Sequence, residues 1–486
     1  MTRKPFNTYG NVIRVPLMKQ QRQMVEFADE HKRYVGLFGD YGVGKTLAAL
    51  AIIANLRMRK VLIVSTKLAI ETTWPTEIRK WTTLRYFLLE GSRKAKLKLL
   101  QRGLQSQIRD AMLYNSMQNA CAKTMLFIIN FDGIKSIAPE LADVQFDAIF
   151  VDESTKIRYV KTARTKYLWA LGVTAKRRYI MTGFPVSEGI HELYAQIKFL
   201  DNGRAFGNSY WSFLHHYFVR QGPHLVPTKS SVKKIIEAIS PFCIRITNKD
   251  LALPEKVRKT IEVKKTKQQE KLFQELHDLF SIELGNVKID VQYIFTLIAK
   301  ALQICDGFVM DKDRNVEIVD TNKDEALLET LEEIDVRKHK VVIWANHVFT
   351  IKKLEVILNN IYKKKGIKIL TLYGKTVDTN LVVNTFQHVP RANLLITSMK
   401  KAAESVTLTA AKYALYYGHQ WSYNVRDNSE ARTCRKGSEI HDHITYADFV
   451  TKGTVERTVL SSTLRKGNLV ASLKEQFLDM GIDKTE

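Results

Sequence analysis

The sequence GDYGVGKT, which occupies residues 39–46, lies between two apolar runs. The run before it, residues 34–38 (YVGLF), has the continuous apolar pattern of a buried strand. The run after it, residues 47–53 (LAALAII), has the pattern of a buried helix. A glycine loop that joins a strand to a helix and ends in Gly-Lys-Thr is a phosphate-binding loop in its expected context. The stretch therefore predicts an α/β fold that binds a nucleoside triphosphate.

Each part of this loop is expected to contribute to the binding of ATP and Mg²⁺. The glycines allow successive backbone N–H groups to point at an anion, and the helix N-terminus adds the positive end of its dipole. Lys45 is expected to reach the β- and γ-phosphates, and the Thr46 hydroxyl to hold Mg²⁺. The predicted nucleotide-binding residues of the loop are Gly39, Asp40, Tyr41, Gly42, Val43, Gly44, Lys45 and Thr46.

A second acidic motif fits the same chemistry. Residues 147–154 read DAIFVDES, which predicts a strand that ends in Asp152 and Glu153. An aspartate at such a strand end holds Mg²⁺, and the next carboxylate can orient or deprotonate the attacking water. We therefore expect Asp152 as a metal ligand and Glu153 as a catalytic residue, together with Lys45.

The overall charge indicates a polyanionic partner. The chain has 486 residues with 75 Lys+Arg and 50 Asp+Glu, a formal net charge of +25 and a pI near 9.6. Nucleic acid and an anionic membrane surface both fit such a balance. No run approaches the ~20 apolar residues of a membrane span, and the N-terminal residues lack an apolar signal core. The scattered cysteines indicate reduced thiols in a cytoplasmic protein; they are Cys121, Cys243, Cys305 and Cys434.

Further apolar runs predict two α/β lobes. In the first half, residues 61–65, 125–129 and 178–181 are expected to be buried parallel strands. In the second half the same pattern occurs at residues 341–344, 369–372, 394–397 and 413–417, around a helix at 352–361. The intervening residues 201–310 are helical and aromatic in pattern. His215 and His216 in this segment suggest a metal site, but no Cys or carboxylate lies nearby at ligand spacing, so core and surface histidines are favoured.

Three other residues leave alternatives open when they are taken alone. Gln21 fits on an amphipathic helix, where it is either a surface residue or a hydrogen-bond partner of an adenine edge. Arg432 and Arg435 are three residues apart, which places them on one helix face. They are either arginine fingers that neutralise charge on the γ-phosphate or a basic turn that meets DNA or solvent.

The ordered set of motifs resembles the superfamily-two helicases and, more narrowly, the Swi/Snf-type DNA translocases. The motifs that carry the resemblance in the core are Gln21, GDYGVGKT, VLIVST, VDES, TGFP, TSMKKAAESVTLTAA and NSEARTCRKG. Outside the core, the similar segments are VDESTKIRYVKTARTKYLWAL, TGFPVSEGIHELYAQIKFLD, FGNSYWSFLHHYF, ISPFCIRITNKDLALPEK, ALQICDG and KGTVERTVLSSTLRKGNLVASL. The resemblance extends from about Leu17 to Leu473.

This resemblance implies a two-lobed, ATP-dependent motor on duplex or branched DNA. The fold it implies has two RecA-like parallel-sheet lobes with a helical insertion: lobe 1 at 1–200, insertion and linker at 201–310, lobe 2 at 311–455 and a helical brace at 456–486. It implies that Gln21 binds the nucleotide and that Arg432 and Arg435 act in hydrolysis. The expected DNA contacts, which lie at strand ends, are Thr66, Lys67, Asn130, Lys375, Thr397 and Lys400.

The chain departs from the family pattern at several positions. Residues 402–405 (AAES) replace a glycine-rich loop, Thr407 replaces an Asn, Asn428 replaces a Gln, and Ala431 replaces an acidic residue. The compact form is similar to bacterial or phage repair and recombination enzymes. The alternatives are a strand-separating helicase on single-stranded DNA or RNA, a nucleic-acid-binding scaffold with a decayed ATPase, and a peripheral membrane ATPase.

Overall fold

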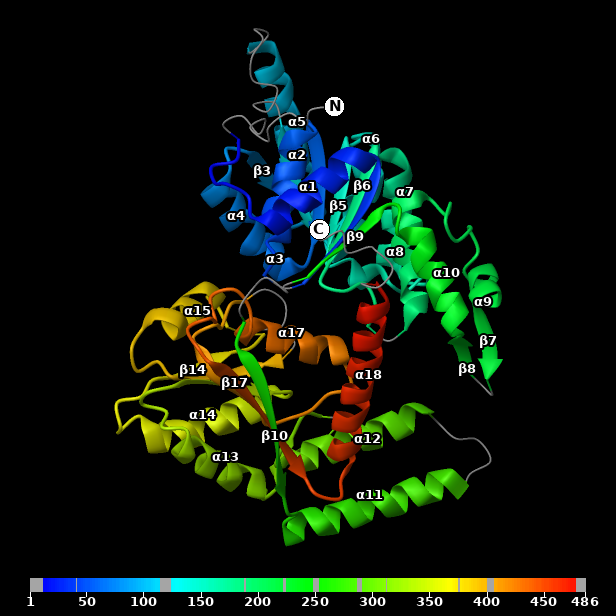
Figure 1. The fold of residues 1–486 in the computed structure, drawn as a ribbon. Coiled ribbons are helices and arrows are strands. Elements are labelled where there is room, and N and C mark those ends of the chain that lie inside the picture. Colours follow the sequence, from blue (N-terminus) through cyan, green and yellow to red (C-terminus); the bar gives the residue numbers. More distant parts are fainter. Residues whose placement is uncertain are drawn as a thin grey trace. The chain divides into compact units, whose positions relative to one another are not determined.

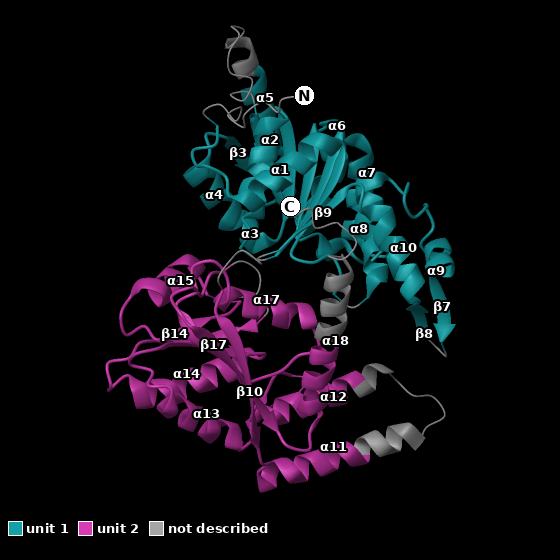
Figure 2. Ribbon diagram, in the orientation of Figure 1, with its two compact units in different colours: residues 1–250, 469–486 teal, residues 251–468 magenta. Residues whose placement is uncertain are grey.

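The computed structural model divides the chain into two compact units, which Figure 2 shows in different colours. Unit 1 comprises residues 1–250 and 469–486, and unit 2 comprises residues 251–468. The structure describes residues 12–40, 42–113, 124–187, 189–221, 224–247, 253–285, 291–311, 313–374, 376–399 and 406–477. Three predicted site residues, Tyr41, Lys375 and Lys400, lie outside these described residues. Both units are parallel α/β structures (Figure 1), which confirms the predicted fold class.

Unit 1 is built on a seven-stranded sheet in the order β3-β4-β2-β5-β6-β1-β9. Every neighbouring pair in this sheet is parallel. The central strands are short apolar runs buried on both faces, as the sequence predicts. The strands are β1 (Tyr34–Gly39), β2 (Lys60–Ser65), β3 (Arg85–Leu88), β4 (Met125–Asn130), β5 (Ala148–Asp152), β6 (Arg177–Thr182) and β9 (Cys243–Ile246).

Helices pack on both faces of this sheet and form two apolar cores. One core includes Met24, Ala48 and Trp74 from α1, α2 and α4; the other includes Ile134, Leu168 and other residues from α6, α7, α8 and α10. The helices are α1 (Lys19–His31), α2 (Lys45–Asn55), α3 (Lys67–Glu71), α4 (Thr73–Trp81), α5 (Arg93–Leu113), α6 (Phe131–Asp143), α7 (Ala163–Thr174), α8 (Leu193–Asp201), α9 (Tyr210–Tyr217) and α10 (Lys229–Ile239). An antiparallel hairpin of β7 (Phe218–Gln221) and β8 (His224–Pro227) lies between α9 and α10 in the sequence.

Unit 2 is built on a six-stranded parallel sheet in the order β10-β17-β16-β13-β15-β14. Its strands are β10 (Glu255–Val263), β13 (Lys340–Ala345), β14 (Ile369–Leu372), β15 (Leu394–Ser398), β16 (Ala411–Tyr416) and β17 (His443–Thr451). Its helices are α11 (Lys267–Gly285), α12 (Val291–Cys305), α13 (Asn322–Glu333), α14 (Val348–Tyr362), α15 (Thr379–His388) and α17 (Tyr423–Thr433). A hairpin pairs β11 (Phe308–Met310) with β12 (Val316–Ile318), and α18 (Val455–Phe477) follows β17.

The structure divides residues 201–310, which the sequence predicts as one helical insertion. Helices α9 to α12 confirm the helical character, but the same range also supplies a strand to each sheet. β9 pairs with β1 in unit 1, and β10 pairs with β17 in unit 2. Both strands were missed because β9 has only four residues and β10 is an edge strand that is mostly charged and exposed.

Two other expectations concern metal binding and membrane insertion. His215 and His216 lie on the exposed side of α9, and no cluster of metal-ligating side chains occurs in the part of the chain that the structure describes. The described helices include none whose length and apolar content would allow it to cross a membrane.

Candidate functional site

The phosphate-binding loop of unit 1 has the backbone geometry that its glycines permit. β1 ends at Gly39 and α2 begins at Lys45, so the loop connects a strand to a helix as predicted. Gly42 and Gly44 have φ values of 90° and 75°, a region that side chains disfavour. A Cβ atom on Gly44 would lie 2.1 Å from Nε2 of Gln21. Glycine at position 44 is therefore required both by the backbone angle and by the close approach of Gln21.

Gln21 connects this loop to the start of α1. Its Oε1 accepts a hydrogen bond from the Met18 backbone at 2.9 Å, and its Nε2 donates to the Gly44 carbonyl at 3.3 Å. The side chain is buried, which rules out the surface alternative for this residue. In this conformation both polar ends of Gln21 hold backbone groups beside the loop.

The Lys45 ammonium donates to two carbonyl oxygens of its own loop. Its Nζ lies 2.7 Å from the oxygen of Gly39 and 3.2 Å from that of Asp40. Burial lowers the pKa of Lys45, while the carboxylates of Glu153, Asp152 and Asp40 oppose this shift. Thr46 is half-buried in the first turn of α2, where backbone N–H groups of the helix have no partner within the helix. This end of α2 thus combines a cation, a hydroxyl and the backbone amides of a helix N-terminus, which is the chemistry of a phosphate site.

Asp152 is held at the carboxyl end of β5 by three donors. Its Oδ2 accepts from Ser65 Oγ at 2.9 Å and from Trp74 Nε1 at 3.1 Å, and its Oδ1 accepts from the Glu153 backbone at 3.1 Å. Burial raises the pKa of Asp152, against the lowering effect of these hydrogen bonds and of Lys45. The carboxylate therefore has a fixed orientation. Sequence analysis missed Ser65 as a partner of this carboxylate.

Glu153 adopts a left-handed backbone conformation with φ 53° and ψ 54°. Such angles are uncommon for a residue with a side chain and often occur at functional sites. The turn ends β5 and leads into a 3-10 helix, Ser154–Ile157. Carboxylate and hydroxyl oxygens from Asp152, Ser65 and Thr46 are the hard ligands that Mg²⁺ prefers, so the residue types present fit this ion.

Arg245 is a second side chain that sequence analysis missed. It lies on β9 and is 1% exposed. Its guanidinium donates to a carboxylate oxygen of Asp40 and, at 2.5 Å, to the carbonyl oxygen of Gly183 in the TGFP motif. The Asp40 backbone N–H also donates to the carbonyl of Ile246 at 3.0 Å. No local sequence pattern could reveal this contact, because Arg245 and Asp40 are 205 residues apart in the chain.

In unit 2, α17 carries Arg432 but not Arg435. The helix ends at Thr433, so the prediction that both arginines share one helix face is wrong. The Thr433 hydroxyl donates to the Glu430 carbonyl at 3.0 Å, and Ser438 accepts from the Arg435 backbone at 3.1 Å. These local bonds replace the next helical turn. Arg432 is buried within unit 2, and Arg435 is half-buried in the turn.

A network of charged side chains holds α17 against the sheet of unit 2. Glu430 accepts from Arg258 of β10 through both carboxylate oxygens, at 2.6 and 2.7 Å, and from Nε of Arg426 at 2.9 Å. Arg426 also pairs with Asp448 of β17 and lies over the ring of Tyr416, 3.4 Å from its centroid. These groups come from three strands and one helix, so the network fixes the position of α17 within the unit.

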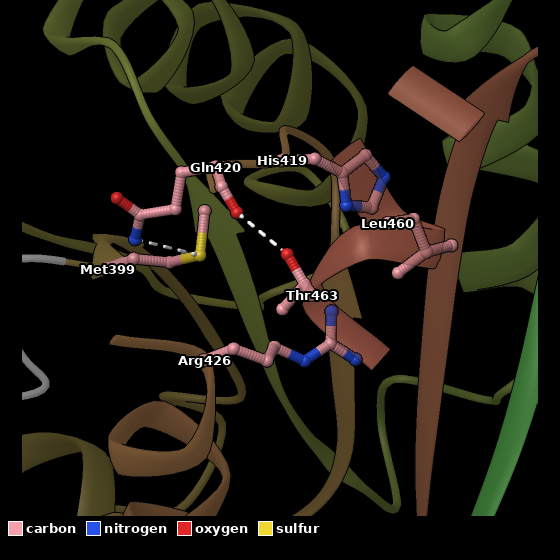
Figure 3. A pocket seen from close by; sticks show the side chains of 6 residues that line it. All are labelled: Met399, His419, Gln420, Arg426, Leu460 and Thr463. Atoms are coloured by element: carbon pink, nitrogen blue, oxygen red, sulfur yellow. Dashed lines mark hydrogen bonds between the residues drawn. The ribbon is translucent and has the colours of Figure 1, made fainter. Parts of the chain in front are cut away.

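A pocket of unit 2, drawn in Figure 3, lies beside this network. Its lining residues are Met399, His419, Gln420, Arg426, Leu460 and Thr463. The Thr463 hydroxyl donates to the Gln420 carbonyl at 3.2 Å, and the Gln420 amide contacts the Met399 sulfur at 3.7 Å. Since His419 and Arg426 are also paired with protein groups, the pocket gives no indication of a ligand.

Predicted DNA-contact residues have different surroundings. Thr66 and Asn130 cap α3 and α6, where their side chains accept backbone N–H groups at 3.3 and 2.6 Å. Lys67 is exposed, and its Nζ lies 3.9 Å from Oε1 of Glu71. Thr397 is buried and donates to the Leu372 carbonyl at 2.9 Å, so in this conformation it joins β15 to β14. Lys375 and Lys400 lie outside the described residues.

Comparison with known proteins identifies the family to which these motifs point. The model of the SNF2-related domain matches residues 20–310, more than half of the chain. A SWI/SNF-related regulator of chromatin from Xenopus tropicalis is 24% identical over 462 residues, which cover 90% of this chain and 43% of that protein. An uncharacterised ATP-dependent helicase of Mycoplasma genitalium is 23% identical over 473 residues, 93% of this chain and 42% of that protein.

A phage protein and a solved structure are also similar. A putative protein of an Acyrthosiphon pisum secondary endosymbiont phage is 24% identical over 308 residues, 59% of this chain and 63% of that protein. The ATPase core of a Sulfolobus solfataricus SWI2/SNF2 protein, solved with double-stranded DNA, is 19% identical with a TM-score of 0.43, covering 96% of this chain and 95% of that one. The chain spans less than half the length of the Xenopus and Mycoplasma relatives.

Proposed function

Because the chain belongs to the SNF2-related family, we propose that it is an ATP hydrolase that couples hydrolysis to movement along DNA. One observation supports this proposal most strongly. Lys45 begins the helix that follows β1, Asp152 ends β5 and Glu153 follows it; all three lie at the carboxyl edge of one parallel sheet, where α/β proteins bind their ligands. The half-buried carboxylate of Asp152, held by Ser65 and Trp74, supports a metal-binding role rather than a purely structural one.

The proposed roles follow from the chemistry of each group. Lys45 and the amides of the loop bind the β- and γ-phosphates of ATP, and Thr46 and Asp152 hold Mg²⁺. Bound Mg²⁺ neutralises charge on the phosphate oxygens. Glu153 orients the attacking water and accepts its proton. Gln21 positions the loop from the side of α1 and is the proposed adenine contact.

Arg432 and Arg435 remain the proposed donors of positive charge to the γ-phosphate during hydrolysis. Their place in the family motif supports this proposal, and an arginine finger contributes roughly 10³–10⁵ in rate. Since Arg435 lies beyond the end of α17, the two side chains are carried by different local structures. We therefore expect Arg432→Ala and Arg435→Ala to lower the rate by different factors while ATP remains bound.

The proposed substrate is duplex or branched DNA, in repair, recombination or replication in a bacterial or phage-infected cytoplasm. The net charge of +25 and the SWI/SNF-related and phage relatives support this substrate and setting. Contacts to the DNA backbone make binding largely independent of base sequence. The proposed contact residues are Thr66, Lys67, Asn130, Lys375, Thr397 and Lys400.

ATP turnover by the full chain tests the proposal. The chain is assayed with linear duplex, fork, four-way junction and single-stranded DNA, and with RNA, beside a Lys45→Ala variant as the inactive control. The proposal predicts stimulation by duplex-containing DNA, and preference for fork or junction would establish the branched substrate. Stimulation by single strands or RNA alone would indicate a strand-separating helicase. DNA binding without hydrolysis would indicate a scaffold.

A further inference from the structure

The chain passes from unit 1 to unit 2 between β9 and β10, and each strand carries an arginine that binds a carboxylate in an ATP-site segment. Arg245 of β9 binds Asp40 of the phosphate loop, and Arg258 of β10 binds Glu430 of the helix that carries Arg432. We propose that Arg245 and Arg258 are positioning residues: Arg245 fixes the phosphate loop for nucleotide binding, and Arg258 fixes α17 for hydrolysis. This inference rests on the proposed function.

The contacts of Arg245 join three parts of unit 1. Its guanidinium reaches both the Asp40 carboxylate and the Gly183 carbonyl, and it lies over the ring of Phe184 at 5.3 Å. The Asp40 carbonyl in turn accepts from the Lys45 ammonium at 3.2 Å. Asp40 thus contacts Arg245 with its own side chain and Lys45 with its own backbone carbonyl, and so connects the two. Loss of the guanidinium releases the first turn of the loop and the residue that holds the Lys45 side chain.

The two partners of this ion pair differ in burial. Arg245 is 1% exposed, whereas the Asp40 side chain is 30% exposed. A buried guanidinium that lacks its carboxylate retains an uncompensated charge, so Arg245 depends on Asp40. Because the loop binds the phosphates in the ground state and in the transition state alike, a displaced loop weakens nucleotide binding itself.

The contacts of Arg258 are of the same kind, but they concern hydrolysis rather than nucleotide binding. Glu430 is 2% exposed, and both its oxygens accept from Arg258. Burial would raise the pKa of Glu430, but Lys256, Arg258 and Arg426 together lower it to about 2. The carboxylate is therefore ionised throughout the physiological range. Arg432 follows two residues later in α17, so this pair fixes the last turn of the helix from which Arg432 projects.

The two pairs predict opposite kinetic signatures. Interactions that position groups acting only in the transition state affect kcat and leave ground-state binding unchanged. We therefore expect Arg245 variants to raise the Kd for ATP and Arg258 variants to lower kcat at an unchanged Kd. A purely structural role for either arginine would lower the fraction of folded protein and leave the Kd and kcat of that fraction unaltered.

The Arg245 half is tested by ATP binding to the full chain, measured by calorimetry. Arg245→Met is expected to raise the Kd on the order of tenfold, since small displacements of a binding group have effects of this size. Arg178→Met is the matched control, because Arg178 donates to the Gly172 carbonyl at 2.9 Å from the opposite end of the sheet. An unchanged Kd in folded Arg245→Met would overturn this half.

Asp40→Asn keeps the test decisive where Arg245→Met fails to fold. It removes the charge from the less buried partner without changing its shape, and is expected to raise the Kd about as much as Arg245→Met. The double variant should cost no more than either single variant, because both remove one interaction. Additive losses, or an unchanged Kd in Asp40→Asn, would contradict the proposed pair.

The Arg258 half is tested by steady-state ATP turnover with DNA present. Arg258→Met is expected to lower kcat on the order of tenfold with an unchanged Kd for ATP, and Arg258→Lys to recover part of the loss. Lys412→Met is the matched control, since Lys412 pairs with an exposed Asp442 at 2.9 Å in the same unit. A raised Kd or an unchanged kcat would overturn this half. If the unsubstituted chain binds ATP without hydrolysing it, the proposed function and the Arg258 half both fail, while the Kd still decides the Arg245 half.

Discussion

The indole N–H of Trp74 donates a hydrogen bond to Oδ2 of Asp152 over 3.1 Å, and Ser65 donates to the same oxygen. Trp74 is fully buried on α4, so a core side chain also orients the proposed Mg²⁺ ligand. Burial raises the pKa of Asp152, and the donors counteract that rise by stabilising the charged form. The indole of Trp74 therefore affects the proposed metal site through the ionisation of Asp152.

Trp74→Phe is predicted to shift the acid side of the pH–rate profile toward higher pH. Asp152 must be ionised to bind Mg²⁺, so activity falls as pH decreases through its pKa. That pKa already lies above the ordinary value of an aspartate, and removal of a donor to the charged form raises it further. The measurement is kcat/KM for ATP against pH, with Mg²⁺ titrated at each pH.

Two further variants separate this effect from loss of packing. Ser65→Ala removes the other donor to the same oxygen with almost no change in volume, and should shift the profile in the same direction. Trp81→Phe, at the end of the same helix, is the matched control and should leave the profile unchanged. A pH–rate profile that is not shifted in either Trp74→Phe or Ser65→Ala would show that these donors do not control Asp152.

Gly44→Ala is predicted to abolish tight ATP binding and to destabilise unit 1. The φ of 75° costs a residue with a side chain about 1–2 kcal/mol, and the new Cβ would meet Nε2 of Gln21. Adding Gln21→Ala should relieve the clash but not the backbone strain, so binding should recover only in part. Gly374→Ala is the control, because no atom lies within 4 Å of its Cβ position and its φ lies outside the left-handed region. Thermal unfolding and ATP calorimetry give both readouts, and tight binding by Gly44→Ala would contradict the prediction.

Continuous apolar runs explain why much of the fold could be predicted from the sequence. β1, β2, β4, β5 and β6 are buried on both faces, so their side chains are apolar regardless of the distant chain. The same reasoning located β13 to β16 in unit 2. The edge strand β10, with the sequence EKVRKTIEV, escaped because exposed edges permit charged residues.

The candidate site shows a similar division. Lys45 and Asp152 belong to motifs whose spacing is local, so the sequence alone predicts them as site residues. Arg245 was missed because its partners, Asp40 and Gly183, come from distant strands that meet only in the folded sheet. The end of α17 was also missed, since Thr433 is held by the hydroxyl of Tyr446 at 3.0 Å, a contact that a helical periodicity does not contain.

Lys67→Ala is predicted to weaken binding to duplex DNA equally for unrelated base sequences. Lys67 is exposed at the start of α3, and its side chain is 77% accessible. Loss of one phosphate contact should reduce the log–log slope of affinity against salt by about 0.9. The slope is measured by fluorescence anisotropy at several salt concentrations.

Lys176→Ala, at the amino end of β6, removes the same charge from the opposite edge of the sheet and should leave the slope unchanged. An equal slope for Lys67→Ala and the unsubstituted chain would remove Lys67 from the DNA contacts.

Lys323→Met is predicted to destabilise unit 2 by roughly 3–5 kcal/mol, because it leaves buried carboxylates without their cation. Lys323 is fully buried, where its ammonium pairs with Glu456 of α18, lies 3.5 Å from Asp306 and donates to the Tyr417 carbonyl at 2.8 Å. Adding Glu456→Gln removes one of the unpaired charges and should recover part of the loss, which a simple packing defect would not do.

Lys412→Met is the control, since its partner is exposed and such pairs contribute at most about 1 kcal/mol. Denaturant unfolding measures all three variants. If the double variant is less stable than Lys323→Met, Glu456 is stabilised by other groups and the ion pair does not anchor the first turn of α18.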